Sequence, residues 1–243
     1  PKVVELPSVV RIVTDVRSDL RTLSYNLPAE TDARAKFLAL AKQIVVATFL
    51  DTDAALGCIL LHQEGNYSAR HCVDTAIVAI VIARALKKTE EEITLLAAAA
   101  LTMNLSMLRQ QERLQEKSDG LSAEEQELIY RHPQESVEQL MAAGIRDEAW
   151  LSWILAHHEN EDGSGYPSKK RGPEIPQNAK IISVADRYCA RVCARSYRKS
   201  LLPNAALRDI LVGGKTTVDL MLVTLFIREL GTYPIGTFVK LEN

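Results

Sequence analysis

The sequence predicts an all-α fold, on three observations. Apolar residues recur at helical spacing through most of the 243 residues. Two stretches, Thr89-Glu90-Glu91-Glu92 and Ser122-Ala123-Glu124-Glu125, have the form of a capping box, in which a hydroxyl and a glutamate satisfy the free N–H groups of a helix start. Segments 68–86 and 95–101 are strongly apolar, which indicates buried helices at the centre of one core.

The first half of the chain divides into helices at its polar, glycine and proline breaks. Pro28 follows the first amphipathic segment, and Gly65-Asn66 follows the third. The capping box at Thr89 begins a further helix, expected to run to about residue 113. The helices expected before it cover residues 7–23, 31–49, 53–62 and 68–86.

The second half begins with the capping box at Ser122. Its helix is expected to end near His132-Pro133, because a proline disfavours helical geometry in the residue before it. Further helices are expected at 134–143, 150–156, 179–194, 204–212 and 216–230, with a long loop at 168–177 and a short C-terminal β element at 237–241. We divide the chain into an N-terminal helical segment, 1–54, which is an accessory layer or a linker, and a main domain, 55–243.

The composition excludes several classes of protein. The 47% of apolar and 25% of charged residues are typical of soluble globular proteins, and the net charge of -2 gives no general attraction to nucleic acid or anionic lipid. No apolar run approaches the roughly 18 residues of a membrane span. The four cysteines form no Cys-x-x-Cys pair, which indicates reduced thiols. We therefore expect a cytoplasmic protein with no membrane segment and no nucleic-acid polymer as partner.

Two adjacent histidines, His157 and His158, close the helix expected at 150–156. An acidic run and the turn at 162–167, Asp-Gly-Ser-Gly-Tyr-Pro, follow them. Neutral imidazole is a common ligand of divalent metals, so this stretch predicts a metal site beside a substrate loop. Taken alone, the pair is open to a second interpretation, in which it only complements the helix dipole and the glycines only form a turn.

An aspartate in the apolar helix at 179–194, Asp186, favours the metal site. A buried, unpaired carboxylate costs several kcal/mol, and a cation would supply its partner. Helical folds build metal sites from nitrogen and oxygen ligands on several helices. The candidate ligands are His71, His132, His157, His158 and Asp186.

The chain resembles the HD-GYP domains over roughly residues 55–243. The resemblance rests on an ordered series of motifs: His157-His158-Glu159, Asp162-Gly163-Ser164-Gly165-Tyr166-Pro167, Glu174-Ile175-Pro176, Ala185-Asp186-Arg187-Tyr188, Arg195-Ser196-Tyr197-Arg198 and Tyr233-Pro234-Ile235-Gly236-Thr237-Phe238-Val239. HD-GYP domains are all-α bacterial members of the HD superfamily that hydrolyse cyclic di-GMP with two or three irons or manganeses. The resemblance implies an HD-GYP helical bundle and a role in signal transduction.

The resemblance also implies a role for each matching residue. His71 and His132 match metal ligands, His157 and His158 match ligands of the same metal as His132, and Asp186 matches a ligand of the other metal. The signature loop corresponds to Gly165, Tyr166 and Pro167. Two further matches, Arg195 and Arg198, correspond to positions that hold the phosphates of the dinucleotide, a role suited to guanidinium groups. A solvated loop is an equally open interpretation of these two arginines.

The chain departs from the family at the His-Asp dyad of the central helix. Met103-Asn104 replaces the dyad, Met107 replaces a lysine three residues later, and Tyr67 stands where an acidic ligand is expected before His71. Two dications repel each other and need a bridging anion, which Asn104 cannot supply. The thioether of Met103 is too soft for Fe(II) or Mn(II). We expect the binuclear centre to be lost.

Three functional hypotheses follow, with no catalytic residue assigned. The first, which we favour, is a non-catalytic signalling domain that binds cyclic di-GMP or a partner, with diguanylate cyclase (GGDEF) domains as candidate partners at the 165–167 loop. The second is an active phosphodiesterase with a remodelled one-metal centre on His132, His157 and His158. The third is a helical interaction scaffold. The expected cofactor is one divalent metal, iron or manganese in preference to zinc, or none if the site is fully degenerate.

Overall fold

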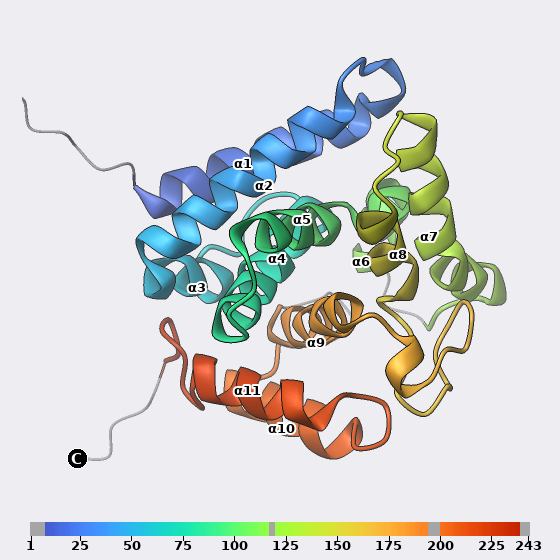
Figure 1. Cartoon of the computed structure of the whole chain (residues 1–243). Coiled ribbons are helices and arrows are strands. Elements are labelled where there is room, and N and C mark those ends of the chain that lie inside the picture. Colours follow the sequence, from blue (N-terminus) through green and yellow to red (C-terminus); the bar gives the residue numbers. More distant parts are fainter. Residues whose placement is uncertain (1–7, 117–119, 194–199, 239–243) are drawn as a thin grey trace, which may run out of the picture.

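The computed structural model describes residues 8–116, 120–193 and 200–238 (Figure 1). Within these ranges the chain forms α-helices and short 3-10 helices and contains no strand, so the all-α prediction is confirmed. The helices of the first half are α1 Val9–Tyr25, η1 Leu27–Ala29, α2 Ala33–Leu50, α3 Thr52–Leu61, α4 Tyr67–Ala85, α5 Glu90–Thr102, η2 Leu105–Met107 and α6 Leu108–Glu116. Those of the second half are α7 Ala123–Ala142, α8 Glu148–Ala156, η3 Gly172–Glu174, α9 Gln177–Val192, α10 Pro203–Gly213 and α11 Leu220–Leu230.

Helix α4 lies at the centre of the molecule. All its residues from Tyr67 to Ala83 are buried, as expected for a helix that is apolar on every side. It packs against α5 and α9, while α1 and α2 cover one side of this core and α10 and α11 lie on the opposite side (Figure 1). The alanine run 97–100 of α5 is fully buried, and its small side chains let the neighbouring helices approach closely.

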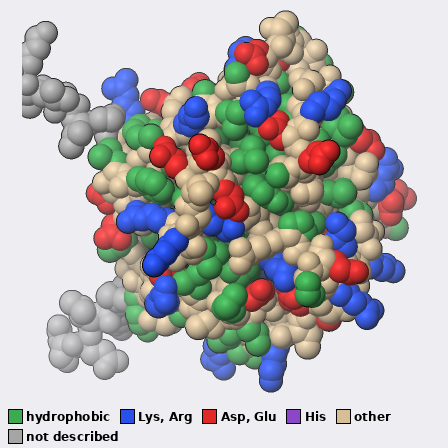
Figure 2. Space-filling view, viewed as in Figure 1, with side chains coloured by type: hydrophobic (Ala, Val, Ile, Leu, Met, Phe, Trp, Pro, Cys, Tyr) green, Lys and Arg blue, Asp and Glu red, His purple; other side chains and the backbone are tan. Residues whose placement is uncertain are grey.

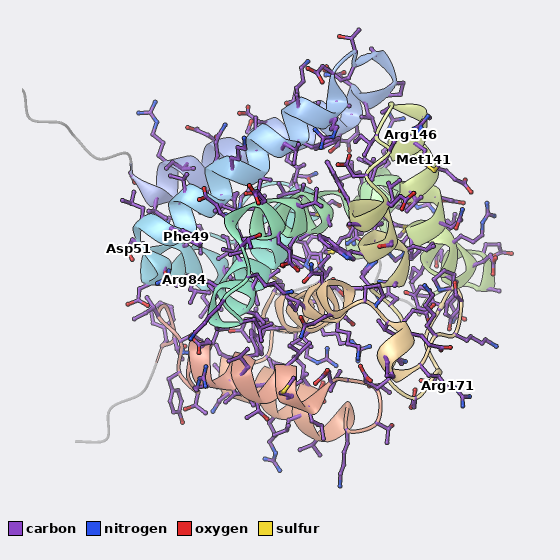
Figure 3. All side chains as sticks on the ribbon, in the orientation of Figure 1. Phe49, Asp51, Arg84, Met141, Arg146 and Arg171 are labelled. Atoms are coloured by element: carbon purple, nitrogen blue, oxygen red, sulfur yellow. The ribbon has the colours of Figure 1, made fainter. Side chains whose placement is uncertain are left out.

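The N-terminal helices share this core. Arg17 of α1 pairs with the fully buried Asp74 of α4, and its guanidinium also donates to the carbonyl oxygens of Cys58 and His62. Arg84 of α4 lies over the ring of Phe49 of α2, 5.3 Å from its centroid (Figure 3). The division at residue 54 remains a prediction. On the face in Figure 2, charged side chains of both signs are interspersed among apolar ones.

The prediction of one long helix from Thr89 to about residue 113 is wrong. Helix α5 ends at Thr102, Met103 and Asn104 form a turn, and η2 and α6 follow. Thr102 bonds the carbonyl oxygen of Ala98 and accepts the indole N–H of Trp150, which fixes the end of α5. Asn104 has φ -108° and ψ 24°, a turn conformation that asparagine tolerates well.

The C-terminal strand expected at 237–241 is not found where the structure describes it. The backbone N–H of Thr237 donates to the carbonyl oxygen of Pro234 in a turn, and Phe238 lies outside any strand. Residues 239–241 lie outside the described residues. Helix α11 starts four residues later than expected, because Asp219 accepts the N–H groups of Met221 and Leu222 and so begins the helix there.

One continuous stretch of the described chain, Glu90–Gln111, is long and apolar enough to cross a membrane. Within the fold, 78% of the most apolar part of this stretch is buried. Helices α2 and α3 are long and apolar enough to cross a membrane only when they are taken together, and a 109° bend separates them. Burial of this kind is expected of central core helices.

Candidate metal centre and ligand pocket

Three histidines meet where α7, α8 and the following loop converge. His132 lies within α7, His157 caps the C-terminus of α8, and His158 follows it. One ring nitrogen from each lies within 4.8 Å of the others. His132 and His157 are buried and His158 is half-buried. The structure thus brings together three of the five predicted ligands.

Two backbone carbonyl groups fix the tautomers of His132 and His157. The Nδ1 of His132 lies 2.6 Å from the carbonyl oxygen of Ile129, and the Nδ1 of His157 lies 2.5 Å from that of Ile154. A carbonyl oxygen only accepts, so each Nδ1 carries the proton and each neutral ring presents an Nε2 lone pair. This assignment follows from the hydrogen-bond partners.

Burial keeps the three rings neutral. Desolvation, helped by repulsion from His157, lowers the pKa of His132 to about 3. Desolvation also lowers the pKa of His157. The pKa of His158 is held well below its ordinary value by burial and then by the neighbouring histidines. Neutral imidazole is the form that binds metal.

The distance between two of the lone pairs fits a shared cation. The Nε2 atoms of His132 and His157 are 3.3 Å apart. Two neutral acceptors gain nothing from facing each other at that distance, whereas two nitrogens bound tetrahedrally at about 2.0–2.1 Å from one metal would be about 3.3 Å apart. The residues present therefore fit a divalent metal on three imidazoles.

The prediction that a helix ends near His132-Pro133 is wrong, and the carbonyl group of Ile129 explains why. Helix α7 continues through Pro133 to Ala142, so the separate helix expected at 134–143 is its second half. In an unbroken helix the N–H of residue 133 would donate to the carbonyl oxygen of Ile129, but proline has no N–H. The ring of His132 donates to that oxygen instead, so the acceptor remains satisfied.

The other two predicted ligands form a separate pair. The Nε2 of His71 on α4 lies 2.7 Å from the Oδ1 of Asp186 on α9. Burial opposes ionisation of Asp186, but the hydrogen bond and charge of His71, with His158 and His157, hold its pKa below the ordinary value. Neither residue belongs to the three-histidine group, and the Nδ1 of His71 has no hydrogen-bond partner.

The signature loop turns back onto the histidines because residue 165 is a glycine. A Cβ there would lie 2.4–2.5 Å from backbone atoms of His158, Glu159 and Asn160, too close for any side chain. The backbone N–H of Tyr166 donates to the carbonyl oxygen of His158, and the Tyr166 ring stacks on the His158 ring at 4.8 Å. Pro167, after a cis peptide bond, is exposed.

Two positioning residues were missing from the sequence prediction. Glu159 is buried, and its carboxylate accepts the backbone N–H groups of Ser168 and Lys170, which holds the far side of the loop. Arg187 of α9 donates to Asn160 and Thr217. Both residues belong to motifs that carry the family resemblance, Glu159 directly after the histidine pair and Arg187 directly after Asp186, but the motifs alone gave neither a role.

A pocket of about 220 Å³ lies beside these groups. His71, His132, His158, Tyr166 and Asp186 line it. Three of the four departures from the family pattern line it as well: Tyr67, Asn104 and Met107. The fourth, Met103, is fully buried in the hydrophobic core. The Oε1 of Gln111, also on the wall, has no hydrogen-bond partner.

The predicted phosphate ligands Arg195 and Arg198 lie outside the described residues. Among the described residues on the pocket wall there is no lysine or arginine.

Comparison with known proteins gives the family. A family model described as the HD domain matches residues 23–221. The cyclic di-GMP phosphodiesterase PdeB of Borreliella burgdorferi is 26% identical over 180 residues, which cover 74% of this chain and 47% of the relative. The cyclic di-GMP phosphodiesterase response regulator RpfG of Xanthomonas campestris is 33% identical over 158 residues, which cover 65% of this chain and 42% of the relative.

The solved structure of Bd1817, an HDG"Y"P protein from Bdellovibrio bacteriovorus, has the same fold. It matches with a TM-score of 0.77 and 16% identity, over 93% of this chain and 73% of the neighbour. The chain spans about half the length of the curated relatives it matches. This chain therefore belongs to the HD domain family and forms an HD-GYP-type domain.

Proposed function

We propose that this domain is a bacterial, cytoplasmic signalling module that holds one divalent metal on His132, His157 and His158. In this proposal it binds cyclic di-GMP at the adjacent pocket, and its capacity for hydrolysis is lost or strongly impaired. The observation that carries the proposal is the pair of unprotonated Nε2 atoms 3.3 Å apart, beside a pocket that Asn104 and Met107 also line. The curated relatives named as cyclic di-GMP phosphodiesterases support the ligand class.

Each group on the wall has a defined capacity toward such a ligand. A divalent metal, when bound, would polarise a phosphoryl oxygen. The ring of Tyr166 lies against His158 and closes the loop side of the pocket. The free Oε1 of Gln111 can accept an N–H group of a base. At about 220 Å³ the pocket is smaller than the roughly 300–1,000 Å³ common for ligand pockets, so a dinucleotide would extend beyond it.

Impaired hydrolysis is proposed from three neighbouring groups. Asn104 offers an amide where two metals would need a shared negative charge. The Nε2 of His71 and the Oδ1 of Asp186 bond each other at 2.7 Å, so this pair of atoms does not hold a second metal. Met107 adds an uncharged thioether to the wall and leaves a phosphate without a cation there.

An active phosphodiesterase with a one-metal centre is the second candidate. The hydrogen-bonded pair of His71 and Asp186 favours it, because an imidazole oriented by a carboxylate can move a proton during hydrolysis. Both residues line the same pocket as His132 and His158. A third possibility, a scaffold without ligand, requires that neither metal nor dinucleotide binds.

A diguanylate cyclase (GGDEF) domain remains the candidate partner at the 165–167 loop. Pro167 offers an exposed contact point, while the Tyr166 ring faces inward to His158 and Tyr130. A partner would therefore bind the outer edge of the loop. Binding of a purified GGDEF domain by the wild type, and its loss in Pro167→Ala, would test this role.

The test of function measures metal stoichiometry by elemental analysis after anaerobic loading with Fe(II) or Mn(II), and then calorimetry with cyclic di-GMP. We expect one metal per chain, a binding heat and no linear product. His157→Ala should lose the metal, whereas the exposed control His62→Ala should keep it. Turnover abolished by His157→Ala would establish the phosphodiesterase, and absence of both metal and heat would leave the scaffold.

A further inference from the structure

A second pocket, of about 300 Å³, lies between α1 and the start of α4. Three arginines line it: Arg17 and Arg21 from α1 and Arg70 from α4. His62 and Glu64, both exposed, are the other titratable residues on its wall. The metal centre and the signature loop contribute nothing to this pocket.

Arg70 is a buried arginine whose side chain has no hydrogen-bond partner at its Nε. Only 5% of its surface is exposed, and its buried Nε has no hydrogen-bond partner. Among the described residues no ion pair to its guanidinium is found, and its Cζ lies over the ring of Tyr67, 5.6 Å from the centroid. A buried charge without a partner is costly, and a ring face compensates only part of that cost.

The buried carboxylate of Asp74 is hydrogen-bonded to Arg17 through one of its two oxygens. Asp74 lies one turn after Arg70 on α4, but the Oδ1 of Asp74 accepts from Arg17 and no hydrogen bond joins Asp74 to Arg70. The terminal N–H groups of Arg17 also donate to the carbonyl oxygens of Cys58 and His62, while its Nε has no hydrogen-bond partner. The charges of Arg70 and Asp74 attract each other, but no hydrogen bond joins them, so the N–H donors of Arg70 are left for a group inside the pocket.

The backbone adds a second positive element. Helix α4 has 19 residues and begins at this pocket, where Asn66 and Ala69 form part of the wall. The N-terminus of a long helix carries a partial positive charge that favours anions. Arg21, an exposed residue that lines the pocket and whose guanidinium lies over the ring of Tyr25, offsets the charge of Glu64.

We infer that this pocket is a binding site for a phosphate-type oxyanion, with Arg70 as the central ligand and Arg21 at the rim. A planar guanidinium presents paired N–H donors that match two phosphate oxygens. The ligand is either inorganic phosphate or the terminal phosphate monoester of a nucleotide. The two sources share the group that Arg70 would bind, and they differ in whether a nucleoside extends out of the pocket.

The test is calorimetric titration of the metal-free protein, in EDTA, with inorganic phosphate and separately with GMP, at constant ionic strength set by chloride. EDTA removes metal-mediated phosphate binding at the three histidines. We expect saturable binding by the wild type, loss of at least tenfold in affinity in Arg70→Gln, and a smaller loss in Arg21→Gln. The matched control is Arg11→Gln, which removes an exposed arginine of α1 that lies outside the pocket.

Each outcome of the titration decides something. Tighter binding of GMP identifies the monoester as the ligand, and equal or tighter binding of phosphate identifies the inorganic ion. No saturable heat with either anion overturns the proposal, as does unchanged affinity in both pocket variants. If Arg70→Gln does not fold, Arg21→Gln and Arg11→Gln still separate a pocket from a general charge effect, because each loses one exposed arginine of α1.

Discussion

The Nδ1 of His132 lies 2.6 Å from the carbonyl oxygen of Ile129, the acceptor that Pro133 leaves free in α7. A proline within a helix is usually costly because it removes a hydrogen bond and crowds the preceding turn. Here the freed acceptor orients an imidazole and sets its tautomer. The irregularity of the helix and the metal-binding capacity of its histidine therefore have one origin.

Pro133→Ala should separate these two effects. The new N–H would compete with His132 for the carbonyl oxygen of Ile129, so we expect a higher melting temperature but weaker metal binding. Loss of a partner that orients a ligand typically costs about 10–100-fold in metal affinity. Metal titration and thermal melting of the same sample measure both. Gln134→Ala, on the exposed side of the same turn, is the control, and unchanged affinity in Pro133→Ala would contradict the tautomer argument.

Stability of the metal-free protein should fall as the pH is lowered through the range below neutrality. The pKa of His132 is about 3 in the fold and about 6.5 when unfolded, so below pH 6.5 the unfolded chain binds more protons. Between pH 7.5 and 5.5 this residue should lower the free energy of unfolding by about 1.4 kcal/mol. Urea denaturation of the wild type and His132→Gln at both values isolates its share from other groups.

The titration of Asp186 does not affect the comparison of wild type and His132→Gln. Asp186, whose pKa is lowered, affects stability only below the ordinary carboxyl range and does not contribute between pH 5.5 and 7.5. A pH dependence equal in both proteins would mean that His132 is already protonated in the fold.

Asn104→Asp should raise the metal content above one per chain. The substitution returns a negative charge to the pocket wall near His71 and Asp186, which a second dication requires. Elemental analysis after loading with Mn(II) measures the change, and Asn104→Ala is the control for loss of the amide alone. The double change Met103→His with Asn104→Asp is less informative, because Met103 is packed in the core and an imidazole there would be destabilising. An unchanged count would contradict our account of the lost second metal.

Gly165→Ala should weaken ligand binding at the pocket without unfolding the protein. The new methyl group would meet three backbone atoms at 2.4–2.5 Å, so the loop must move and Tyr166 would leave the His158 ring. We expect at least a tenfold loss of cyclic di-GMP affinity by calorimetry. Gly120→Ala, where no atom lies within 4 Å of the added carbon, should bind as the wild type does. Full affinity in Gly165→Ala would show that the loop position is unimportant.

Arg17→Ala should destabilise the whole domain. It leaves the fully buried carboxylate of Asp74 without its partner, a change that typically costs about 3–5 kcal/mol. Chemical denaturation measures the loss. Arg17→Ala combined with Asp74→Asn should recover part of it, since the double change removes the buried charge. A loss in Arg17→Ala no larger than in the exposed variant Arg11→Ala would rule out this role for the ion pair.

The helical fold could be predicted from the sequence because helices depend on local patterns of apolar spacing and capping. Apolar spacing and caps located most of the helices, and the motifs around His157 and Asp186 pointed to side chains that the fold brings into one region. The interruption of α5 depends on Trp150, which lies 48 residues away and donates to Thr102. A local pattern contains no information on such a contact.

The prediction that a helix ends near Pro133 failed for a similar reason. A proline disfavours helical geometry in the residue before it, and the sequence does not show that the ring of His132 would satisfy the acceptor that Pro133 leaves free. Glu159 belongs to a motif of the family resemblance but has no predicted role, because its burial depends on the loop that returns over it and donates two N–H groups. These residues became interpretable only when their partners were known.

The ring of Tyr67 lines the metal-side pocket and contacts Arg70, which lines the other candidate site. It stacks on His71 with ring centroids 5.4 Å apart, lines the metal-side pocket and also supports the guanidinium of Arg70. If an oxyanion on Arg70 restrains this ring, occupancy of one pocket changes the free energy of binding at the other. Thermodynamic reciprocity then requires that phosphate alter metal affinity by the same factor by which metal alters phosphate affinity. Tyr67, which stands where the family has an acidic ligand, would in that case link the two sites.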